Sequence, residues 1–371
     1  MIILEHGPGG AALFDRPQVV VVAWTAAEVL PALARLDAAR AAGHWVAGYL
    51  TYEAGFALEP ALAGLMPQVE GPLLAFGIYD APLPAPALRP ATAQLAPLVP
   101  MISGADYGDA FDRVKAYIGA GDCYQINLTF PLETRLLSGS PLDLYAALRV
   151  RQAVGYGAFV DLGGGPVLVS RSPELFLRLD AGGRIEARPM KGTAPRDADP
   201  VEDALLAEGL RNSPKDQAEN LMIVDLLRND IARICKVGSV KVPELFHVES
   251  YATVHQMVSR VVGQLAAPAS LLGVMQALFP CGSITGAPKI RAMQIIREVE
   301  PHVRGAYCGT IGWMAPDGSA SFNVAIRTLQ LYGDRVRLNV GGGVVYDSKA
   351  EGEWQEAMWK TRYARGLVTP A

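Results

Sequence analysis

The chain has 371 residues, of which half are hydrophobic and 19% are charged, a composition typical of a globular protein that buries a substantial core. Its 33 basic and 37 acidic residues leave a formal charge of −4, and no lysine or arginine cluster provides the basic groove that nucleic-acid binding requires. No basic segment precedes an apolar stretch at the N-terminus, and the apolar run at residues 19–27 ends at Glu28, so we expect neither a signal peptide nor a membrane span.

The apolar periodicity predicts a mixture of helices and strands along the chain. Helices are expected near residues 26–42, 106–120, 142–152, 201–208, 215–232, 270–277, 288–298 and 351–366. Strands are expected near residues 18–24, 45–52, 124–132, 158–162, 167–170, 175–179, 185–188, 307–314, 322–331 and 336–345. Several consecutive strands lie only a turn apart, which favours antiparallel pairing over repeated β-α-β units and predicts an α/β or α+β fold.

A proline-rich segment at residues 81–100 interrupts this pattern. It holds six prolines and no acidic residue, which is typical of an extended, semi-rigid connector. It separates an N-terminal part, residues 1–100, from a larger region, residues 101–371. The four cysteines are widely spaced and form no C-x-x-C pair, so they indicate neither a zinc site nor a disulfide framework and suit a cytoplasmic protein.

Two pairs of acidic residues lie on predicted helices. Asp216 and Glu219 are three residues apart, as are Glu353 and Glu356, so each pair shares one helix face, and Lys360 follows one turn later. Each pair could bind a hard cation such as Mg²⁺ through oxygen. The ordinary alternatives are a solvated acidic first turn for the first pair and a salt-bridged exposed face for the second.

The segment GSITGAPK at residues 282–289 is a candidate anion site. Gly286 permits a tight turn, and Pro288 suits the first turn of a helix whose N–H groups, with the Thr285 hydroxyl close by, could receive a carboxylate. Its spacing differs from that of a Walker loop, and a plain helix-capping turn is an alternative.

Lys191 lies in RPMKGTAPR, which is expected to be a strand end followed by a loop with the lysine at its tip. Its amine becomes nucleophilic only if burial or neighbouring cations lower its pKa, and otherwise it is a solvated surface lysine. His255 lies in the apolar context ATVHQMVSRV, where most histidines are structural.

Taken together, these segments resemble the chorismate-utilising enzyme family, which includes anthranilate, aminodeoxychorismate, isochorismate and salicylate synthases. The resemblance runs in order from about residue 106 to the C-terminus through GDCYQINLT, SPELF, RPMKGTAPR, AENLMIVDLLRND, VHQMVS, GSITGAPK, YCGTIGW, AIRTL, GGGVVYDS and EGEWQEAMWK. GYLTYEAG at residues 48–55 is similar to the N-terminal part of the aminodeoxychorismate branch. So long a collinear set favours the functional alternative at each segment described above.

The resemblance implies two facing antiparallel sheets flanked by helices, assembled from both parts of the chain as one structural unit. It also implies Mg²⁺ bound by Glu219 and Glu356, with Glu353 nearby and Asp216 in support, facing the ring carboxylate of chorismate. Glu174 matches the general acid that protonates the departing C4 hydroxyl, and burial is expected to raise its pKa. The other matches are His255 near that hydroxyl and the substrate contacts Gln125, Thr285, Tyr307, Arg327, Gly341, Gly342 and Lys360.

Gln125 and Lys191 distinguish the branches of the family. Isochorismate and salicylate synthases resemble one another in carrying a water-activating lysine at the position of Gln125, and anthranilate synthases usually have A-G-T where this chain has K-G-T. The resemblance is therefore to the aminodeoxychorismate branch, which serves para-aminobenzoate and folate synthesis. It implies that Lys191 attacks C2 as the C4 hydroxyl departs, and that ammonia then enters C4 and expels the lysine.

The resemblance also implies a separate glutamine amidotransferase subunit as the source of ammonia, since no cysteine here lies in an amidotransferase-like motif. Two alternatives stay open. One is anthranilate synthase component I, which would also eliminate pyruvate. The other is an inactive homologue that serves as a binding or scaffold subunit, against which the retained carboxylates of Glu174, Glu219 and Glu356 argue.

Overall fold

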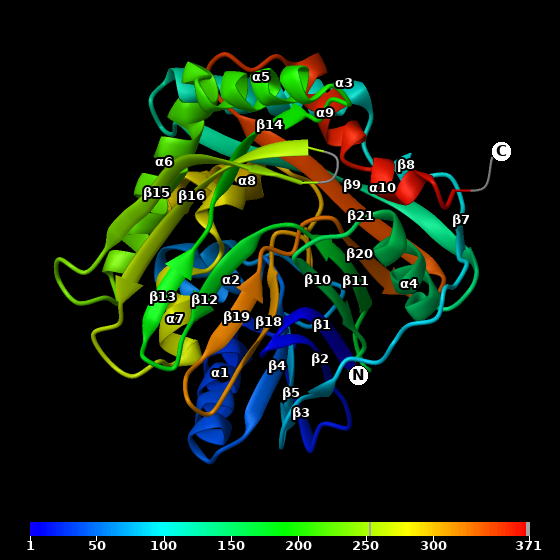
Figure 1. Ribbon diagram of the computed structural model, residues 1–371, viewed down its shortest axis with the longest axis vertical. Coiled ribbons are helices and arrows are strands. Elements are labelled where there is room, and N and C mark those ends of the chain that lie inside the picture. The colour runs from blue at the N-terminus through cyan, green and yellow to red at the C-terminus, as the bar shows by residue number, and fades with distance from the viewer. Residues whose placement is uncertain (252–253, 369–371) are drawn as a thin grey trace.

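Two antiparallel sheets form the centre of the structure, a computed structural model that describes residues 1–251 and 254–368 (Figure 1). The strands of the first sheet are β1 (Ile2–Gly7), β2 (Gly10–Phe14), β6 (Leu83–Pro84), β7 (Gln94–Leu95), β8 (Val99–Pro100), β9 (Gln125–Ser138), β10 (Tyr156–Val160), β11 (Val167–Ser172), β17 (Gly286–Ala287), β20 (Thr328–Tyr332) and β21 (Arg335–Val344). Their order is β17-β9-β21-β20-β11-β10-β1-β2-β6, with β7 and β8 also paired to β9.

The strands of the second sheet are β3 (Val19–Ala23), β4 (Trp45–Leu50), β5 (Leu74–Tyr79), β12 (Leu175–Leu179), β13 (Arg184–Ala187), β14 (Met190–Pro195), β15 (Lys241–Ser250), β16 (Val254–Gln264), β18 (Thr310–Met314) and β19 (Ala320–Asn323). Their order is β14-β16-β13-β12-β19-β18-β4-β5-β3, with β15 also paired to β16. Strands from the first hundred residues lie in both sheets, because β1 pairs with β10 and β4 pairs with β18. The proline-rich segment contributes β6, β7 and β8 along β2 and β9.

Helices flank both sheets, as expected. They are α1 (Ala26–Ala41), α2 (Ala54–Leu58), α3 (Gly104–Gly119), α4 (Pro141–Arg151), α5 (Pro200–Arg211), α6 (Pro214–Ala232), α7 (Leu271–Leu278), α8 (Lys289–Val299), α9 (Ala350–Trp359) and α10 (Arg362–Arg365), with the 3-10 helices η1 (Pro60–Leu65) and η2 (Gly282–Ile284). α1 packs on β3, α4 on β11, α6 on β16 and α9 on β21. Two sheets with flanking helices confirm the expected fold class. No helix in the described ranges is both long and apolar enough to cross a membrane.

Local sequence signals explain where the helices that carry site residues begin. The Ser213 hydroxyl accepts a hydrogen bond from the backbone N–H of Asp216. Pro214 occupies the first turn of α6, where an N–H would have no partner within the helix, so the N–H that proline lacks costs no hydrogen bond. Residues 351–366, expected as one helix, form α9 and α10 instead. They separate where the Thr361 hydroxyl donates to the carbonyl of Met358 and competes with the helical pattern.

Residues 322–331, expected as one strand, form β19 in the second sheet and β20 in the first. The chain turns between them at residues 324–327, where Ile326 N–H donates to the Val324 carbonyl and Arg327 has a φ of 51°. An uninterrupted apolar run does not reveal such a crossover, because both strands are buried. The preceding strand also starts later than expected, at Thr310 rather than at residue 307.

Residues 190–195, expected as a loop with Lys191 at its tip, form strand β14, which pairs with β16. The register shifts between Met190 and Thr193, and Gly192 there has a φ of 81°, a bulge that glycine adopts without strain. The strands β1, β2, β5, β6, β7, β8, β15, β16 and β17 were not expected from the sequence.

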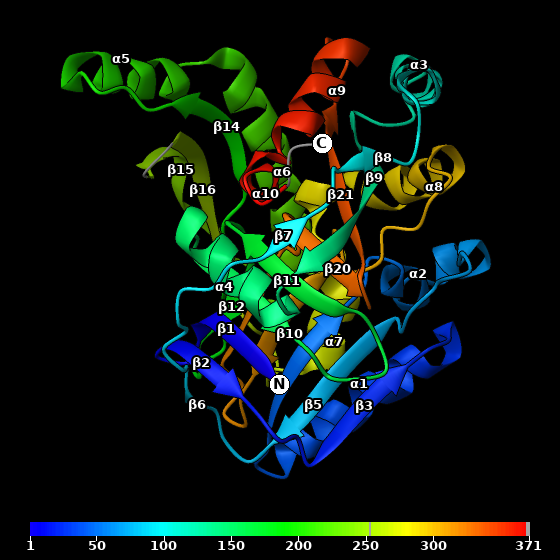
Figure 2. The ribbon, with the colours of Figure 1, turned by 90° about the vertical axis from the view of Figure 1, so that its right-hand side faces the viewer.

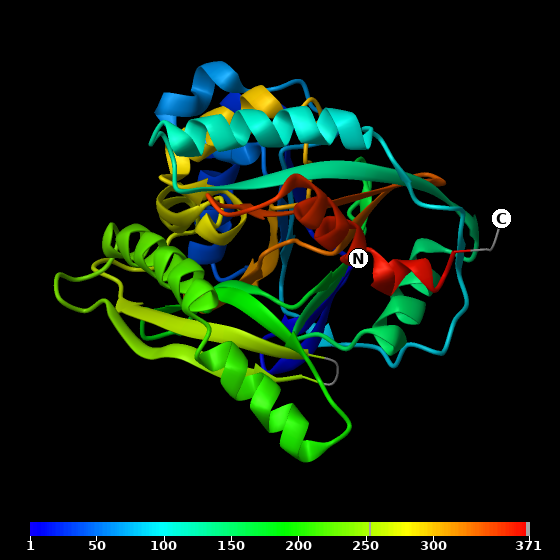
Figure 3. The ribbon, with the colours of Figure 1, turned by 90° about the horizontal axis from the view of Figure 1, so that it is seen from above.

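The helices α3, α5 and α9 lie at one end of the molecule, opposite the strands near the N-terminus (Figures 1 and 2). Seen from above, the green helices α5 and α6 lie on one side, and cyan α3 with red α9 lies on the other (Figure 3). The second sheet supports the first group through β14 and β16, and the first sheet supports α9 through β21. The candidate residues on α6, β14, β21 and α9 therefore gather at this end.

Candidate active site

Lys191 and Gln125 meet where β14 of one sheet approaches β9 and β21 of the other. Gly343 of β21 lies opposite Asn127 of β9. A methyl group placed on Gly343 would lie 2.8 Å from Gln125 Nε2 and 3.1 Å from Lys191 Nζ. Gln125 is fully buried, and both polar atoms of its amide lack a hydrogen-bond partner within the described residues. A buried amide without partners is costly, so a bound ligand would stabilise it.

The environment of Lys191 favours a reactive amine. Burial lowers the pKa of Lys191, the carboxylate of Glu219 opposes this, and the nearby Lys360 ammonium lowers the pKa further, so the net direction is downward. A lowered pKa increases the fraction of neutral amine, which is the nucleophilic form. The sequence alone left a solvated lysine as the alternative, and burial of the amine argues against that alternative.

Glu174 follows β11 in the turn Ser172-Pro173-Glu174 and is 6% exposed. Its backbone N–H donates to the Ser172 hydroxyl at 3.2 Å, and the Ser283 hydroxyl donates to Glu174 Oε1 at 2.7 Å. Burial raises the pKa of Glu174 to about 7, although the hydrogen bond from Ser283 and the charges of Lys191 and Arg327 act in the opposite direction. Near neutral pH the carboxyl group is therefore partly protonated, which a general acid requires.

Two carboxylates of α9 face Gly342. A methyl group there would lie 3.0 Å from Glu353 Oε2 and 3.9 Å from Glu356 Oε1. Burial raises the pKa of Glu219, the charges of Lys191 and Lys215 oppose this, and repulsion from Asp216 and Glu353 adds to the increase. The neighbouring carboxylates thus contribute to the raised pKa, and a cation bound between them would lower it.

Lys360 lies against these carboxylates. Its Nζ pairs with Glu356 Oε1 at 2.9 Å and donates to the carbonyl of Gly341 at 2.8 Å. Burial tends to raise the pKa of Glu356, but the charge and hydrogen bond of Lys360, together with the charges of Lys191 and Lys215, hold the pKa below its usual value. The salt-bridged pair expected from the spacing is therefore present, and it borders the glycines of β21.

The carboxylates suit Mg²⁺, because this ion takes a few carboxylate oxygens and retains water or substrate oxygen in its shell. Asp216 faces β14, since a methyl group on Gly192 would lie 2.7 Å from Asp216 Oδ1. Within residues 1–251 and 254–368, no three acidic, histidine or cysteine side chains are close enough to form a complete metal cage. The donor set thus fits an ion that also needs oxygen atoms of the substrate.

The segment GSITGAPK forms η2 and β17, and β17 extends the first sheet beside β9. The Thr285 hydroxyl donates to the carbonyls of Cys281 and Gly282, both at 3.2 Å, and so it holds the turn together. At Gly286, with a φ of 151°, a methyl group would lie 2.1 Å from the carbonyl oxygen of Gln125. Only glycine allows this close approach of the two backbones.

Tyr307 and Arg327 lie beside the chain crossover between the sheets. Tyr307 is 5% exposed, and burial lowers the pKa of Arg327. His255 lies on β16 and is buried, with Nε2 2.9 Å from Asp203 Oδ1 and Nδ1 2.8 Å from the Ser250 hydroxyl. Both ring nitrogens of His255 therefore contact residues of α5 and β15 rather than the carboxylates described above.

Residues 80–365 match the family model of chorismate binding enzymes. The chain belongs to this family. Aminodeoxychorismate synthase component 1 of Klebsiella aerogenes is 41% identical over 339 residues, which cover 84% of this chain and 74% of that protein. The protein of the same name from Escherichia coli (strain K12) is 46% identical over 254 residues, covering 68% of this chain and 55% of that protein. The chain thus spans just over half the length of the second relative.

Among solved structures, anthranilate synthase component I from Streptococcus pneumoniae has a TM-score of 0.80 at 25% identity, covering 96% of this chain and 91% of that chain.

Two features near the site were not identified from the sequence. The first is Ser283, which lies within GSITGAPK but was not distinguished from its neighbours. The second is the buried Arg304, which donates to the carbonyls of Ile284 at 3.0 Å and Asn127 at 2.6 Å and pairs with Glu300 at 2.8 Å. Arg304 therefore ties the chorismate-family segment GSITGAPK to β9. In the sequence, nothing distinguishes Arg304 from an exposed arginine.

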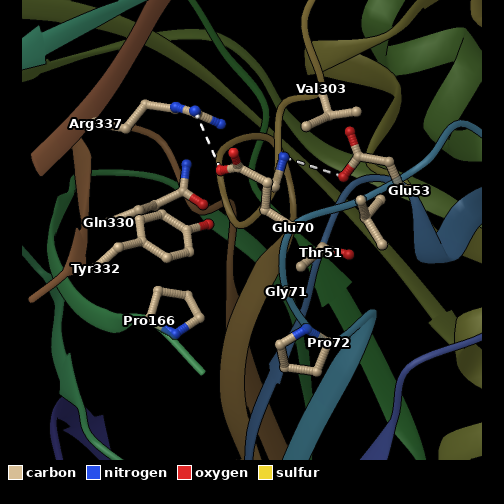
Figure 4. A pocket seen from close by; sticks show the side chains of 12 residues that line it. Thr51, Glu53, Glu70, Gly71, Pro72, Pro166, Val303, Gln330, Tyr332 and Arg337 are labelled. Atoms are coloured by element: carbon tan, nitrogen blue, oxygen red, sulfur yellow. Dashed lines mark hydrogen bonds and ion pairs between the residues drawn. The ribbon is translucent and has the colours of Figure 1, made fainter. Parts of the chain in front are cut away.

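A small pocket lies apart from these residues, between strands β20 and β21 of the first sheet and the loop before β5 of the second (Figure 4). Glu70 and Arg337 pair across it at 3.2 Å, and Glu53 lies on another side. Burial raises the pKa of Glu53 to about 7, opposed by hydrogen bonds from backbone N–H groups. None of the candidate active-site residues lines this pocket.

Proposed function

We propose that this chain is the chorismate-aminating component of a 4-amino-4-deoxychorismate synthase and replaces the C4 hydroxyl of chorismate with an amine. The observation that carries the proposal is the meeting of Lys191 and Gln125 at Gly343. An amide cannot act as a base toward water, whereas an amine with a lowered pKa can act as a nucleophile. The two relatives named aminodeoxychorismate synthase component 1 support the same branch.

The reaction proceeds through two displacements. In the first, Lys191 Nζ bonds to C2, the two conjugated ring double bonds shift toward C4, and the C4–O bond breaks as Glu174 donates its proton, so the hydroxyl leaves as water. In the second, ammonia bonds to C4, both ring double bonds shift back, and the C2–Nζ bond breaks to release neutral Lys191. The ammonium group formed at C4 returns a proton to the Glu174 carboxylate. Chorismate and ammonia are consumed, and 4-amino-4-deoxychorismate and water are formed.

Glu219 and Glu356 would hold Mg²⁺, with Glu353 nearby and Asp216 in support. When bound, the ion supplies positive charge at the ring carboxylate of chorismate and draws electron density toward it. Lys360 binds the Gly341 carbonyl and the Glu356 carboxylate, and it would thereby hold this metal ligand in position. The absence of a side chain at Gly342 leaves room for the substrate ring beside the side chains of α9, whereas Gly341 allows β9 to lie close, because a methyl group there would be 2.3 Å from the Leu128 carbonyl oxygen.

The substrate's second carboxylate, on the enolpyruvyl group, is assigned to Arg327 and Tyr307. The Arg327 guanidinium is desolvated, and a desolvated cation interacts strongly with an anion. Thr285 acts through the turn that its hydroxyl stabilises. Ammonia comes from a separate glutamine amidotransferase subunit, in agreement with the name component 1 of the relatives. The buried, unpaired thiols support a cytoplasmic location.

Incubation of the purified chain with chorismate, Mg²⁺ and an ammonium salt tests this proposal. We expect 4-amino-4-deoxychorismate, which yields para-aminobenzoate only after a lyase is added. Anthranilate fluorescence without a lyase would instead support the anthranilate synthase alternative. Absence of any product, in a folded protein that binds chorismate, would support the scaffold alternative.

A further inference from the structure

Ser283 contacts the carboxyl group of Glu174 in the buried part of the site. Ser283 is 6% exposed, and its hydroxyl donates to Glu174 Oε1 at 2.7 Å. No residue in the described ranges donates a hydrogen bond to the other carboxyl oxygen, Oε2. This oxygen is also not fully enclosed by the protein. The two oxygens therefore differ, since the protein holds one and leaves the other open to a ligand.

We propose that Ser283 is a positioning residue that holds Glu174 Oε1, so that Oε2 carries the proton toward the departing hydroxyl of the substrate. This inference rests on the proposed role of Glu174 as the general acid. Ser283 acts through Glu174 and does not itself touch the reacting atoms. It selects the oxygen that exchanges the proton and stabilises the carboxylate that forms when the proton leaves.

Glu174 is held at both ends. The Ser172 hydroxyl accepts the backbone N–H of Glu174 at 3.2 Å and donates to the carbonyl of Val324 at 2.6 Å. This bond fixes the backbone beside the crossover between β19 and β20. With Ser283 on the carboxyl group, the rotations of the side chain between these two points are restricted, and a fixed acid transfers its proton with less reorganisation.

The position of Ser283 is set by the turn that contains it. The Thr285 hydroxyl bonds to the carbonyls of Cys281 and Gly282, which brackets Ser283 on both sides. The next carbonyl, that of Ile284, accepts hydrogen bonds from Asn127 Nδ2 at 3.1 Å and from Arg304 Nη1 at 3.0 Å. The serine hydroxyl therefore reaches Glu174 from a rigid part of the structure.

The other polar groups that face Glu174 are Lys191 from β14, Arg327 from the crossover and the thiol of Cys281. The Cys281 Sγ lies 3.3 Å from the Ser283 hydroxyl. Burial raises the pKa of Glu174, while the bond from Ser283 lowers it more than either cation does. Removal of the serine hydroxyl should therefore raise the pKa of Glu174 further.

Replacement of Ser283 with alanine tests the inference by two measurements. The first is ¹³C NMR titration of protein labelled at the glutamate carboxyl carbons, with the Glu174 resonance assigned by its loss in Glu174→Gln. We expect Ser283→Ala to raise the midpoint of this resonance by about one pH unit. The second is ammonia-dependent amination, in which we expect kcat to fall about tenfold or more while the KM for chorismate changes less than about twofold.

Two variants serve as controls. Ser283→Thr keeps the hydroxyl and should retain a midpoint close to that of the unmodified chain. Ser321→Ala removes another buried hydroxyl, one without a hydrogen-bond partner in the described residues, and should move neither the midpoint nor kcat. Retention of the midpoint and kcat in Ser283→Ala, in a protein whose Glu174→Gln variant is inactive, overturns the inference and leaves the proposed function intact. An active Glu174→Gln variant overturns both.

Discussion

Replacement of Glu174 with glutamine should make the protein more stable at alkaline pH while it abolishes amination. The folded protein raises the pKa of this carboxyl from its ordinary 4.5 to about 7, mainly through burial. The folded state thus binds the proton more tightly than the unfolded state, so stability is lost as the pH rises from 4.5 through 7. At about 1.4 kcal/mol per pKa unit, the full loss above pH 7 is about 3 kcal/mol.

Glutamine has nearly the same shape, carries no charge and can still accept the bond from Ser283. We expect Glu174→Gln to gain about 3 kcal/mol of unfolding free energy over the unmodified chain at about pH 8.5, and less than about 1 kcal/mol at about pH 5. Urea unfolding at both pH values measures the two differences. The exposed Glu208, which makes no ion pair in the described residues, provides a control, since Glu208→Gln should show no such pH dependence. An equal gain at both pH values for Glu174→Gln would show that this carboxyl is not a buried group with a raised pKa.

Three further predictions concern the nucleophile, the metal and the partner. Lys191→Ala should lose at least about 100-fold in the rate of C4 amination and shift the residual products toward substitution at C2, which chromatography of the products would detect. Amination at the normal rate would leave Lys191 only an electrostatic role. Glu219→Ala and Glu356→Ala should each abolish Mg²⁺-dependent turnover without unfolding the protein, because neither side chain is fully buried. A folded variant with normal activity would remove that residue from the metal site. Glutamine should support turnover only after a glutaminase subunit is added, while ammonium salts at high pH suffice for the chain alone, and glutaminase activity of the single chain would contradict this.

Periodicity predicted the long helices and most central strands because each has a buried face with a regular repeat. It failed at residues 322–331, where two buried strands that belong to different sheets follow one another along the chain. The crossover between them is marked only by the positive φ of Arg327, which the sequence does not reveal. It also failed at β14, because Gly192 and Pro195 are typical of loops, and only the pairing with β16 makes the segment a strand. Tertiary pairing of this kind cannot be read from local preference.

The candidate site was predicted mainly through the family resemblance, since spacing alone could not separate a functional acid from a solvated one. The structure brings Lys191, Gln125 and Glu174 into one buried region and places the carboxylates of α6 and α9 at its edge. Ser283 was missed because its role depends on a contact with Glu174, which lies more than a hundred positions away in the sequence. Arg304 was missed because its role depends on a contact with Ile284, about twenty positions away. Such contacts leave no local pattern.

The measurement that tests the central claim most directly is a search for a covalent adduct on Lys191. Trypsin does not cleave after Arg188, because Pro189 follows, so a modified Lys191 would remain within the peptide of residues 185–196. The chain is incubated with chorismate and Mg²⁺ in the absence of ammonia, quenched, digested and examined by mass spectrometry. The account predicts this peptide with the added mass of chorismate less one water, and its absence from Lys191→Ala and Glu174→Gln. Turnover to 4-amino-4-deoxychorismate on addition of ammonia, with Lys191 unmodified at every time point sampled, would contradict the covalent route.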